Sequence, residues 1–462
     1  MGIPLKFQVF CRNIKGHFDL TVFLCKWDYH SRKEMIVTIL AAMLLTYSTL
    51  TSRDLLDYMA MCLEATLLRI QLGWPMSIFP MEYRPSHDHI TYSVATSSHI
   101  AHNELSFLMS HVYPAAEEEA LGFRNPIVDW GLCKESPLVS DSVSDALMLR
   151  KSLPYKLQEN DESYIYSRHQ LRYIAIRVAN KIQNTQNLQK LEFYGTAAAL
   201  MNEEPVIVRK SYYFSALMTA EAFRSCIFRD NLRGEKEVYT DMTNYFPVRQ
   251  EKIDGQESVR FTPDFYKRVS GRIGVTTILL TEHRRVAMLL QGASKPVGGE
   301  QVNLGGSGSI NYNDVEGAGN PPDLRDVISY AMARELCEET GMQAWFGQAH
   351  INTMITGFFR WIDRCGHPEF TGITHVKNIP FSTHNKVDGD EVVRYEEIPI
   401  AVNEPRDFLA VLDYIREHKI NVALSSLMAL HRLTVIAGYN SKEAGDAQKK
   451  VHHELSYFLN NQ

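Results

Sequence analysis

One stretch of the chain carries more chemical information than any other: Arg334-Glu335-Leu336-Cys337-Glu338-Glu339-Thr340-Gly341-Met342. At about 100° per residue, Glu335, Glu338 and Glu339 fall on one side of an α-helix. Three carboxylates on one side of a helix can meet in a small volume, and hard divalent cations bind carboxylate oxygens. The stretch therefore predicts a helix that ends at a metal site.

The residues before this stretch extend the same helix. An apolar stripe lies on the same side as Glu335 and consists of Leu324, Val327, Ile328 and Ala331. Upstream, Asn320-Pro321-Pro322-Asp323 supplies a capping residue and prolines suited to a first turn, and Gly341 suits the left-handed residue that ends a helix. We predict a helix from about 321 to 340. The alternative, a solvated acidic face, does not explain why the acids continue an apolar stripe.

The run from Arg334 to Met342 resembles the signature of Nudix hydrolases, which reads Gly, five residues, Glu, seven residues, Arg-Glu-aliphatic-x-Glu-Glu-x-Gly-aliphatic. The second half of the signature matches at every specified position. The first half differs, with Asp326 in place of Glu and Asn320 in place of Gly. The family's glycine pair corresponds to Gly305-Gly306, so that residues 307–319, which include Asp314 and Glu316, are expected to form an inserted loop.

The resemblance implies a role for each of these residues. Glu338 and Glu339 would be the main ligands of Mg²⁺ or Mn²⁺, Glu335 a ligand or a base, and Arg334 an ion-pair partner that orients a glutamate. Asp326 would take the supporting metal-ligand role of the missing glutamate, and the Gly306 carbonyl would add a ligand.

Two further residues are candidates from neighbouring loops. Many members of the family use one more acid from a later loop, and Glu391 is favoured here over Asp388 and Asp390. A solvated acidic turn is the alternative. Lys295, in the loop after the second predicted strand, is placed to reach a phosphate, although an ordinary surface lysine is the alternative.

The surrounding pattern predicts an α/β fold of the α+β kind, a Nudix-like mixed sheet sandwiched by helices. Strands are expected over 275–281, 285–290, 351–362 and 370–376. The resemblance covers roughly residues 270–400. We divide the chain into a helical N-terminal region (1–150), a second α/β module (151–268), the Nudix-like domain (269–400) and C-terminal helices packed on it (401–462). These last helices, at 405–417, at 421–436 and in the tail, cover the sheet or make a homo-oligomer.

The second module is predicted to contain a helix over 166–185, a strand over 205–208 and an amphipathic helix over 215–228. The polar run 249–257 is expected to be a linker. In the N-terminal region, helices are expected over 53–72 and 98–112.

Composition excludes several classes of protein. The chain has 462 residues, of which 45% are hydrophobic and 22% charged, a composition typical of globular proteins. Its net charge of −6 gives no strong nucleic-acid signal. Seven scattered cysteines argue against a zinc ribbon or a disulfide-stapled domain and favour a reducing cytoplasm. Residues 35–52 carry no charge, so a membrane anchor through this segment is the alternative to a buried helix.

The resemblance implies a metal-dependent hydrolase of a nucleoside diphosphate linked to another moiety, with a nucleotide-derived small molecule as substrate. Activated water would attack the pyrophosphate linkage. The alternative is a non-catalytic Nudix-like module that senses a nucleotide and transmits its occupancy to the rest of the chain.

Overall fold

The computed structural model describes residues 92–96, 137–158, 167, 169–170, 173, 188–195, 197–202, 204–223, 225–230, 236–246, 248–253, 256–261, 269–292, 301–319, 322–347, 350–361, 364–378 and 392–461. Lys295, Glu391, the segment 35–52 and the predicted helices at 53–72 and 98–112 lie outside these residues, as does most of 166–185. Within the described part of the chain, no helix is long and apolar enough to span a membrane.

By its internal contacts the chain divides into two compact units. One comprises residues 1–94, 167–186 and 228–238, and the other residues 95–166, 187–227 and 239–462. This division is coarser than the four predicted parts, whose boundaries stay predictions. The predicted metal site lies in the second unit.

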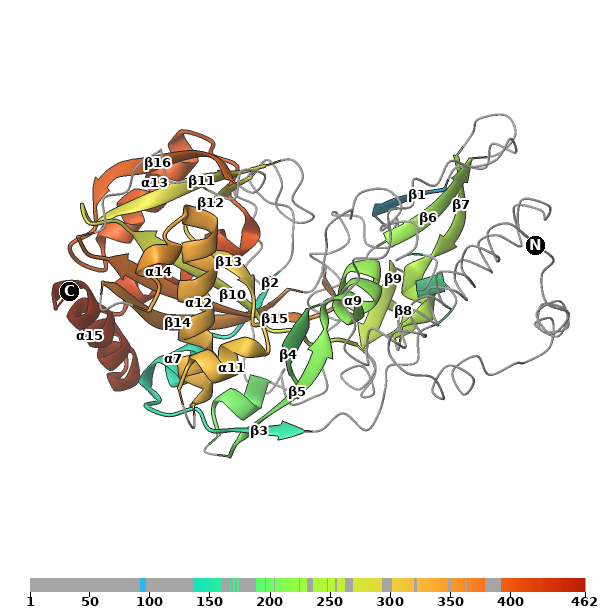
Figure 1. Ribbon diagram of the computed structural model, residues 1–462, viewed down its shortest axis with the longest axis horizontal. Coiled ribbons are helices and arrows are strands. Elements are labelled where there is room, and N and C mark those ends of the chain that lie inside the picture. The colour runs from blue at the N-terminus through green and yellow to red at the C-terminus, as the bar shows by residue number, and fades with distance from the viewer. Residues whose placement is uncertain are drawn as a thin grey trace, which may run out of the picture. The chain divides into compact units, whose positions relative to one another are not determined.

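The largest sheet of the second unit has eight strands. Its path runs β12-β11-β10-β15-β14-β2, with β13 also paired to β10 and β16 to β11. Only the β10–β15 pair is parallel among the strand pairs described in this sheet, so the sheet is mixed and open, which confirms the predicted α+β class (Figure 1). The strands are β2 (Pro137–Val139), β10 (Gly274–Leu280), β11 (Arg285–Gln291), β12 (Val302–Asn303), β13 (Ser307–Ser309), β14 (Ile351–Trp361), β15 (His367–Val376) and β16 (Val392–Ala401).

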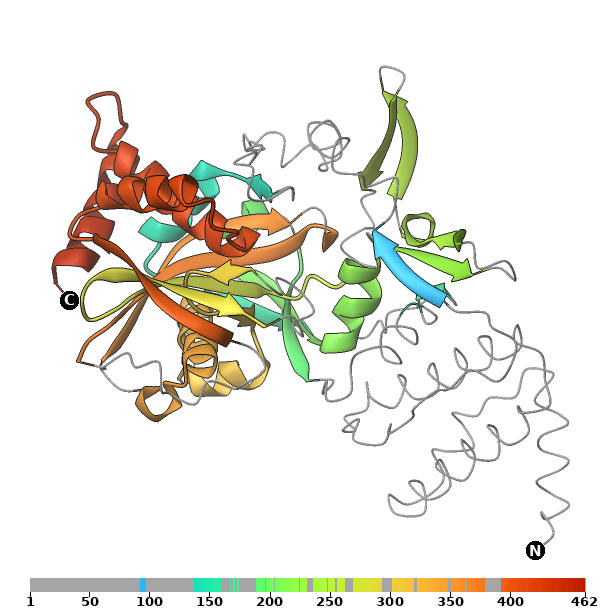
Figure 2. The same cartoon turned by 90° about the horizontal axis from the view of Figure 1, so that it is seen from above.

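Helices cover both faces of this sheet, because its strands present apolar side chains on each face. Helix α12 (Leu324–Thr340) packs on one face, where Val327, Ile328 and Ala331 meet Val275 and Phe370. On the opposite face lie α13 (Asp407–Glu417), α14 (Leu424–Gly438) and α15 (Asp446–Asn460), as Figure 2 shows. Their apolar side chains share a core with Ile278, Leu280 and Ile373. Helix α7 (Asp141–Leu149) packs against β14.

The ends of α12 follow from its sequence. Asp323 caps the first turn, and the Asp326 carboxylate accepts a hydrogen bond from the Asp323 N–H at 3.2 Å, which completes a capping box. At the other end Gly341 has a φ of 70°, a left-handed conformation that glycine adopts without strain. The helix therefore starts three residues later than predicted and ends where predicted.

A smaller sheet, in the order β3-β5-β4, joins the main sheet through its edge strand β4. On the edge that does not pair with β5, β4 exchanges backbone hydrogen bonds with the segments around residues 272 and 310. These include Ile273 N–H to Leu191 O at 3.0 Å and Leu191 N–H to Ile310 O at 3.2 Å. These bonds bring the second predicted module to the start of β10. The strands are β3 (Tyr155–Gln158), β4 (Gln189–Phe193) and β5 (Val206–Tyr212).

Two predictions in the second module are wrong. The helix expected over 215–228 is instead α9 (Tyr213–Ala216) followed by a π-helical turn, η3 (Leu217–Glu221), and the chain then enters β6 (Ser225–Asp230). The linker expected over 249–257 is an antiparallel pair of strands, β8 (Val248–Ile253) and β9 (Gln256–Phe261).

The remaining short elements complete the description. Strands β1 (Tyr92–Thr96), β6 and β7 (Lys236–Asp241) form a sheet in the order β1-β6-β7. The short helical elements are η2 (Ala197–Leu200), η4 (Met242–Tyr245), α11 (Asn313–Gly317) and η5 (Gln343–Trp345).

Candidate active site

Four acidic side chains gather near the C-terminal end of α12, and three of them pair with Arg334. The Arg334 guanidinium donates from Nε to Asp314 Oδ1 at 2.7 Å and from Nη2 to Asp314 Oδ2 at 3.0 Å, a two-pronged ion pair. It also donates to Glu335 Oε1 at 2.9 Å and to Glu338 Oε2 at 2.8 Å. Glu339 follows on the same face. We call Asp314, Arg334, Glu335, Glu338 and Glu339 the acidic cluster.

The backbone of β13 positions two of these carboxylates. The Ser309 N–H donates to Glu335 Oε1 at 3.1 Å, and the Ser307 N–H donates to Glu339 Oε2 at 3.2 Å. Gly308 lies between these two donors, and a Cβ added there would come within 2.1 Å of the Glu335 carboxyl carbon. The absence of a side chain at Gly308 therefore lets Glu335 lie directly against the strand.

The cluster is graded from buried to open. The side chains of Asp314, Glu335 and Arg334 are 3%, 14% and 13% exposed, whereas that of Glu338 is 50% exposed. Partial burial raises the pKa of the Glu338 carboxyl above its ordinary value, although Arg334 acts in the opposite direction. When all four acids are ionised, one guanidinium leaves three negative charges unbalanced.

The donor set has the right chemistry for a hard divalent cation, because all four acids present carboxylate oxygens. Glu335 Oε2 and Glu338 Oε1 accept no hydrogen bond in the part of the chain that the structure describes, and the excess of negative charge favours a cation. Yet no group of three or more acidic, His or Cys side chains in the described ranges is already arranged around one point. Arg334 holds three of the acids, so a cation that uses Glu335 and Glu338 would share them with the guanidinium.

Asp326, the acid in the first half of the signature, lies in the first turn of α12, away from this cluster. Asp326 lies nine residues before Glu335, about 13 Å along the helix, and its carboxylate caps the opposite end of α12. The metal-ligand role of Asp326 stays a prediction, and the contact that the structure gives its carboxylate is a helix-capping one. Asp314 is the acid that reaches Arg334 instead. Its buried place was missed because it lies in the stretch expected to be an inserted loop, where no periodicity marks it.

The glycine pair lies where α12 crosses the sheet. A Cβ on Gly305 would meet the Thr277 carbonyl oxygen at 2.1 Å, and a Cβ on Gly306 would meet the Leu336 backbone at 2.4 Å. The Gly306 carbonyl accepts a hydrogen bond from the Thr277 N–H at 2.9 Å. These contacts give both glycines a packing role, and their part in binding a cofactor stays a prediction.

Sequence patterns also missed a set of buried charged side chains near the start of β10. Lys190 of β4 donates to Asn311 Oδ1, and its charge interacts with those of Glu335 and Asp314. Burial lowers the pKa of Lys190 to about 8. At the start of β15, Glu369 accepts a hydrogen bond from Thr276 Oγ1 at 2.8 Å and lies 3.6 Å from His367 Nε2. Burial raises the pKa of Glu369 to about 7.

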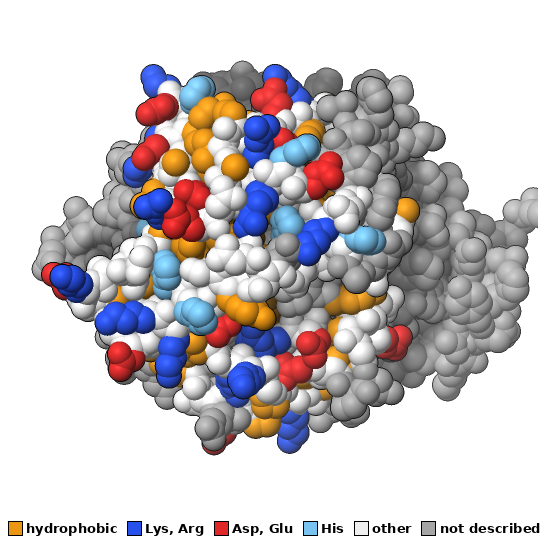
Figure 3. Space-filling model, turned by 90° about the vertical axis from the view of Figure 1, so that its left-hand side faces the viewer, with side chains coloured by type: hydrophobic (Ala, Val, Ile, Leu, Met, Phe, Trp, Pro, Cys, Tyr) orange, Lys and Arg blue, Asp and Glu red, His pale blue; other side chains and the backbone are white. Residues whose placement is uncertain are grey.

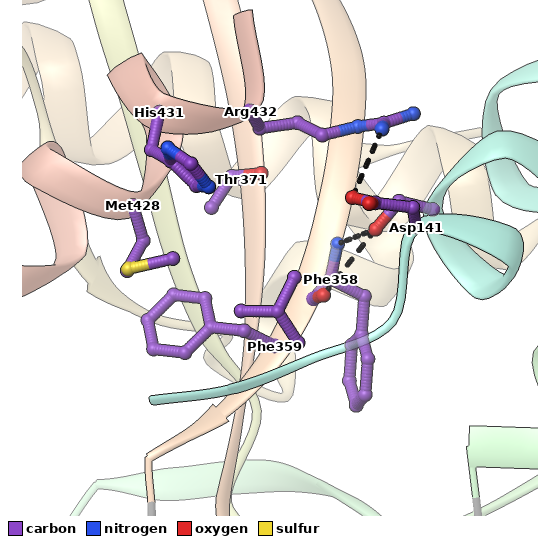
Figure 4. Close-up of a pocket in the computed structure, with 9 residues that line it drawn as sticks. Asp141, Phe358, Phe359, Thr371, Met428, His431 and Arg432 are labelled. Atoms are coloured by element: carbon purple, nitrogen blue, oxygen red, sulfur yellow. Dashed lines mark hydrogen bonds and ion pairs between the residues drawn. The ribbon is translucent and has the colours of Figure 1, made fainter. Parts of the chain in front are cut away.

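A separate small pocket opens between α7, β14 and α14 (Figure 4). Three of its polar side chains are paired: Arg432 lies 3.6 Å from Asp141, and Ser144 exchanges hydrogen bonds with the Phe358 backbone. The cavity holds about 10 Å³, room for about one water molecule. Its residues do not include any member of the acidic cluster, so we assign it a packing role.

The described side chains on the face seen in Figure 3 carry charges of both signs side by side, with histidines among them. A nucleic-acid surface needs clustered Lys and Arg side chains. This face therefore does not offer such a surface.

No family model matches the chain, and no curated protein matches it either. Among solved structures, the crystal structure of DR0079 from Deinococcus radiodurans is similar to part of it. The two share 11% sequence identity over 35% of this chain and 82% of that one, with a TM-score of 0.23. A likeness of this size carries no argument about fold or function.

Proposed function

We propose that the chain is a metal-dependent hydrolase that cleaves the diphosphate linkage of a nucleoside diphosphate joined to another group. The observation that carries this proposal is the acidic cluster at the end of α12, where Glu335, Glu338 and Glu339 share one helix face. The resemblance of this run to the Nudix signature supports the same reaction. Mg²⁺ or Mn²⁺ is the proposed cofactor, because carboxylate oxygens suit both ions.

Each residue of the cluster has a proposed task. Glu335, Glu338 and Glu339 would hold the cation, which would offset phosphate charge and lower the pKa of a nearby water molecule. Arg334 and Asp314 are positioning residues, since the two-pronged pair between them fixes the guanidinium that Glu335 and Glu338 share. The N–H groups of Ser307 and Ser309 orient two of the carboxylates from the side of the sheet.

The test is a screen of the full chain with Mg²⁺ or Mn²⁺ over nucleotide sugars, dinucleotides and nucleoside triphosphates. Products are read by mass spectrometry and by phosphate release. We expect turnover of at least one class, and a loss of about a hundredfold or more in Glu335→Gln and Glu338→Gln.

Glu316→Gln is the matched control. Glu316 is an exposed acid on α11, two residues after Asp314, and no contact of its side chain with the cluster is described. We expect this variant to retain wild-type turnover. The absence of product with either ion, or wild-type turnover in both Glu335→Gln and Glu338→Gln, would refute the proposal.

A second candidate is a module that senses a nucleotide without turnover. The observation that favours it is that Arg334 already occupies three of the acids and that Asp326 caps the far end of α12. If the wild type binds a nucleotide but gives no product at any metal concentration, and Glu338→Gln changes neither result, this candidate replaces the hydrolase.

A further inference from the structure

Two buried cations lie against the same aromatic ring. Lys190 Nζ lies 6.0 Å from the centroid of the Tyr213 ring, and the Arg272 guanidinium carbon lies 5.2 Å from it. Lys190 is 6% exposed and Arg272 7%. The pair is held on a rigid frame, because backbone bridges join Lys190 to Asn311 and Glu192 to Arg272.

Arg272 lacks the partner that a buried guanidinium normally has. Its Nε is buried without a hydrogen-bond acceptor, and no carboxylate pairs with it among the residues that the structure describes. Nearby acids are committed elsewhere: Glu221 pairs with Arg364, whose Nε donates to it at 2.6 Å, and Glu369 accepts from Thr276. Glu221 and Glu369 stabilise the Arg272 charge at longer range, but burial and the nearby Arg364 oppose it, so an anion bound at this position would stabilise the protein.

Lys190 also has donors to spare. An ammonium group carries three N–H donors, and in the described part of the chain Lys190 uses one, to the uncharged amide oxygen of Asn311. Its charge interacts with Arg272 on one side and with Glu335 and Asp314 on the other. Lys190 shares the Tyr213 ring with Arg272 and is linked to the acidic cluster through Asn311, whose N–H donates to Asp314 Oδ2 at 2.7 Å.

We propose that Lys190 and Arg272 form an anion subsite that binds a phosphate group of the substrate beside the acidic cluster. A planar guanidinium and an ammonium are the side chains that recognise phosphate oxygens through charge-assisted hydrogen bonds. A diphosphate-linked substrate has two phosphate groups, and the cluster with its cation would act on one while this subsite holds the other. The assignment of the anion to a substrate rests on the proposed function.

The subsite also gives the second predicted module a task. Lys190 and Tyr213 belong to the segment 187–227, whereas Arg272 directly precedes β10 of the main sheet. The phosphate subsite is thus assembled where β4 meets β10. Substrates without a second phosphate would lose these contacts.

The experiment measures binding of inorganic pyrophosphate and of inorganic phosphate to the full chain by calorimetry without divalent metal. We compare the wild type with Lys190→Met and Arg272→Met, which remove the charge and keep an unbranched, flexible side chain. Lys210→Met is the matched control, because Lys210 lies on the neighbouring strand with its Nζ 4.1 Å from the centroid of the Tyr312 ring. Pyrophosphate affinity should fall about tenfold to a hundredfold in the first two variants and stay within about twofold in the control.

Thermal unfolding distinguishes a binding role from a structural one. Without anion, Arg272→Met should unfold at the same temperature as the wild type or a higher one, because it removes an unpaired buried charge. Pyrophosphate should raise the midpoint of the wild type and leave that of Arg272→Met unchanged. If Arg272→Met does not fold, Lys190→Met and Arg272→Lys carry the same comparison.

Two results would overturn the subsite: no metal-free binding of pyrophosphate by the wild type, or wild-type affinity in both Lys190→Met and Arg272→Met. Glu338→Gln separates this inference from the proposed function, since its metal-free pyrophosphate binding should match the wild type. Pyrophosphate binding that depends on Lys190 and Arg272, without turnover of any substrate, would refute the proposed hydrolase and support the subsite. Turnover of a substrate without metal-free pyrophosphate binding would refute the subsite and leave the proposed hydrolase standing.

Discussion

A single arginine organises the acidic cluster. Arginine suits this place because its planar guanidinium presents donors in several directions, so Arg334 meets Asp314 with two prongs while still reaching Glu335 and Glu338. A lysine could not make this set of contacts. The helix periodicity predicts the three glutamates on one face, but it cannot predict Asp314, because that contact depends on how residues 307–319 fold back on the helix.

Glu369 makes the stability of the fold depend on pH. Burial raises its pKa from 4.5 to about 7, so the folded state holds a proton that the unfolded chain releases. A carboxyl with a raised pKa contributes stability that is fully present below about pH 4.5 and is lost as the pH rises through about 7. We predict that Glu369→Gln, which resembles the protonated acid and still accepts from Thr276, is more stable than the wild type by about 3 kcal/mol at pH 8.

The measurement is urea denaturation of both proteins between pH 4.5 and 8. The gap between them should shrink toward zero at the acid end of this range. Glu396→Gln, at an exposed carboxylate of β16 that is 47% accessible, is the control and should show no such trend. A constant gap across the range would mean that Glu369 does not titrate as described.

At the scale of elements, the sequence predicts helices and strands whose apolar residues recur with a regular period, but it does not predict which distant strands pair. Helix α12 and strands β10, β11, β14 and β15 follow strong periodic patterns and were predicted within a few residues. Ser225-Cys226-Ile227-Phe228 was assigned to a helix, but its apolar and aromatic residues pair into a sheet with β1 and β7. The β8–β9 hairpin has one local signal, the turn-forming dipeptide Asp254-Gly255, whereas the mostly polar residues on either side of it are weak strand formers.

The candidate site shows the same limit. Its glutamates are neighbours on one helix, whereas Lys190 and Arg272 come from segments 145 and 63 residues before Glu335. No local pattern relates a lysine on an edge strand to a distant helix. The pairing of β4 with the chain around residues 272 and 310 brings them together.

The crossing of α12 over the sheet predicts different effects for two glycines. In Gly306→Ala the new Cβ would lie 2.4 Å from the Leu336 backbone, which cannot move without displacing α12. We predict a loss of about 1–3 kcal/mol in the free energy of unfolding. In Gly308→Ala the three atoms nearest the new Cβ all belong to the Glu335 carboxylate, at the end of a flexible side chain, the first of them at 2.1 Å. That variant should lose turnover while its stability changes by less than about 1 kcal/mol.

Urea denaturation and the turnover assay together check this pair of glycine variants. Gly438→Ala serves as a control, since a Cβ there meets no atom within 4 Å. Equal losses of stability in Gly306→Ala and Gly308→Ala would contradict the proposed difference between backbone and side-chain crowding.

At the scale of the whole molecule, residues far apart in the chain complete one core. Strand β2 pairs with β14, and α7 packs on the same strand, although both precede residue 150. Helix α14 reaches α7 through a buried ion pair: Arg432 Nη2 lies 2.5 Å from Asp145 Oδ1, and the two side chains are 4% and 13% exposed. The second unit therefore depends on contacts between segments nearly 290 residues apart.

This ion pair gives a test of how the ends of the unit are coupled. We predict that Asp145→Ala costs about 3–5 kcal/mol in the free energy of unfolding, because among the described residues it leaves the buried Arg432 with the more distant Asp141 as its one carboxylate partner. Arg432→Met should cost less, since methionine fills much of the space without a charge. The double variant should lose about 1–3 kcal/mol less than the sum of the losses in the two single variants, measured by urea denaturation of the full chain. Asp413→Ala, in an exposed pair with Arg416 at 3.7 Å, is the control and should cost less than about 1 kcal/mol. Losses that simply add would mean that α7 and α14 are held together by apolar packing, with the ion pair contributing nothing.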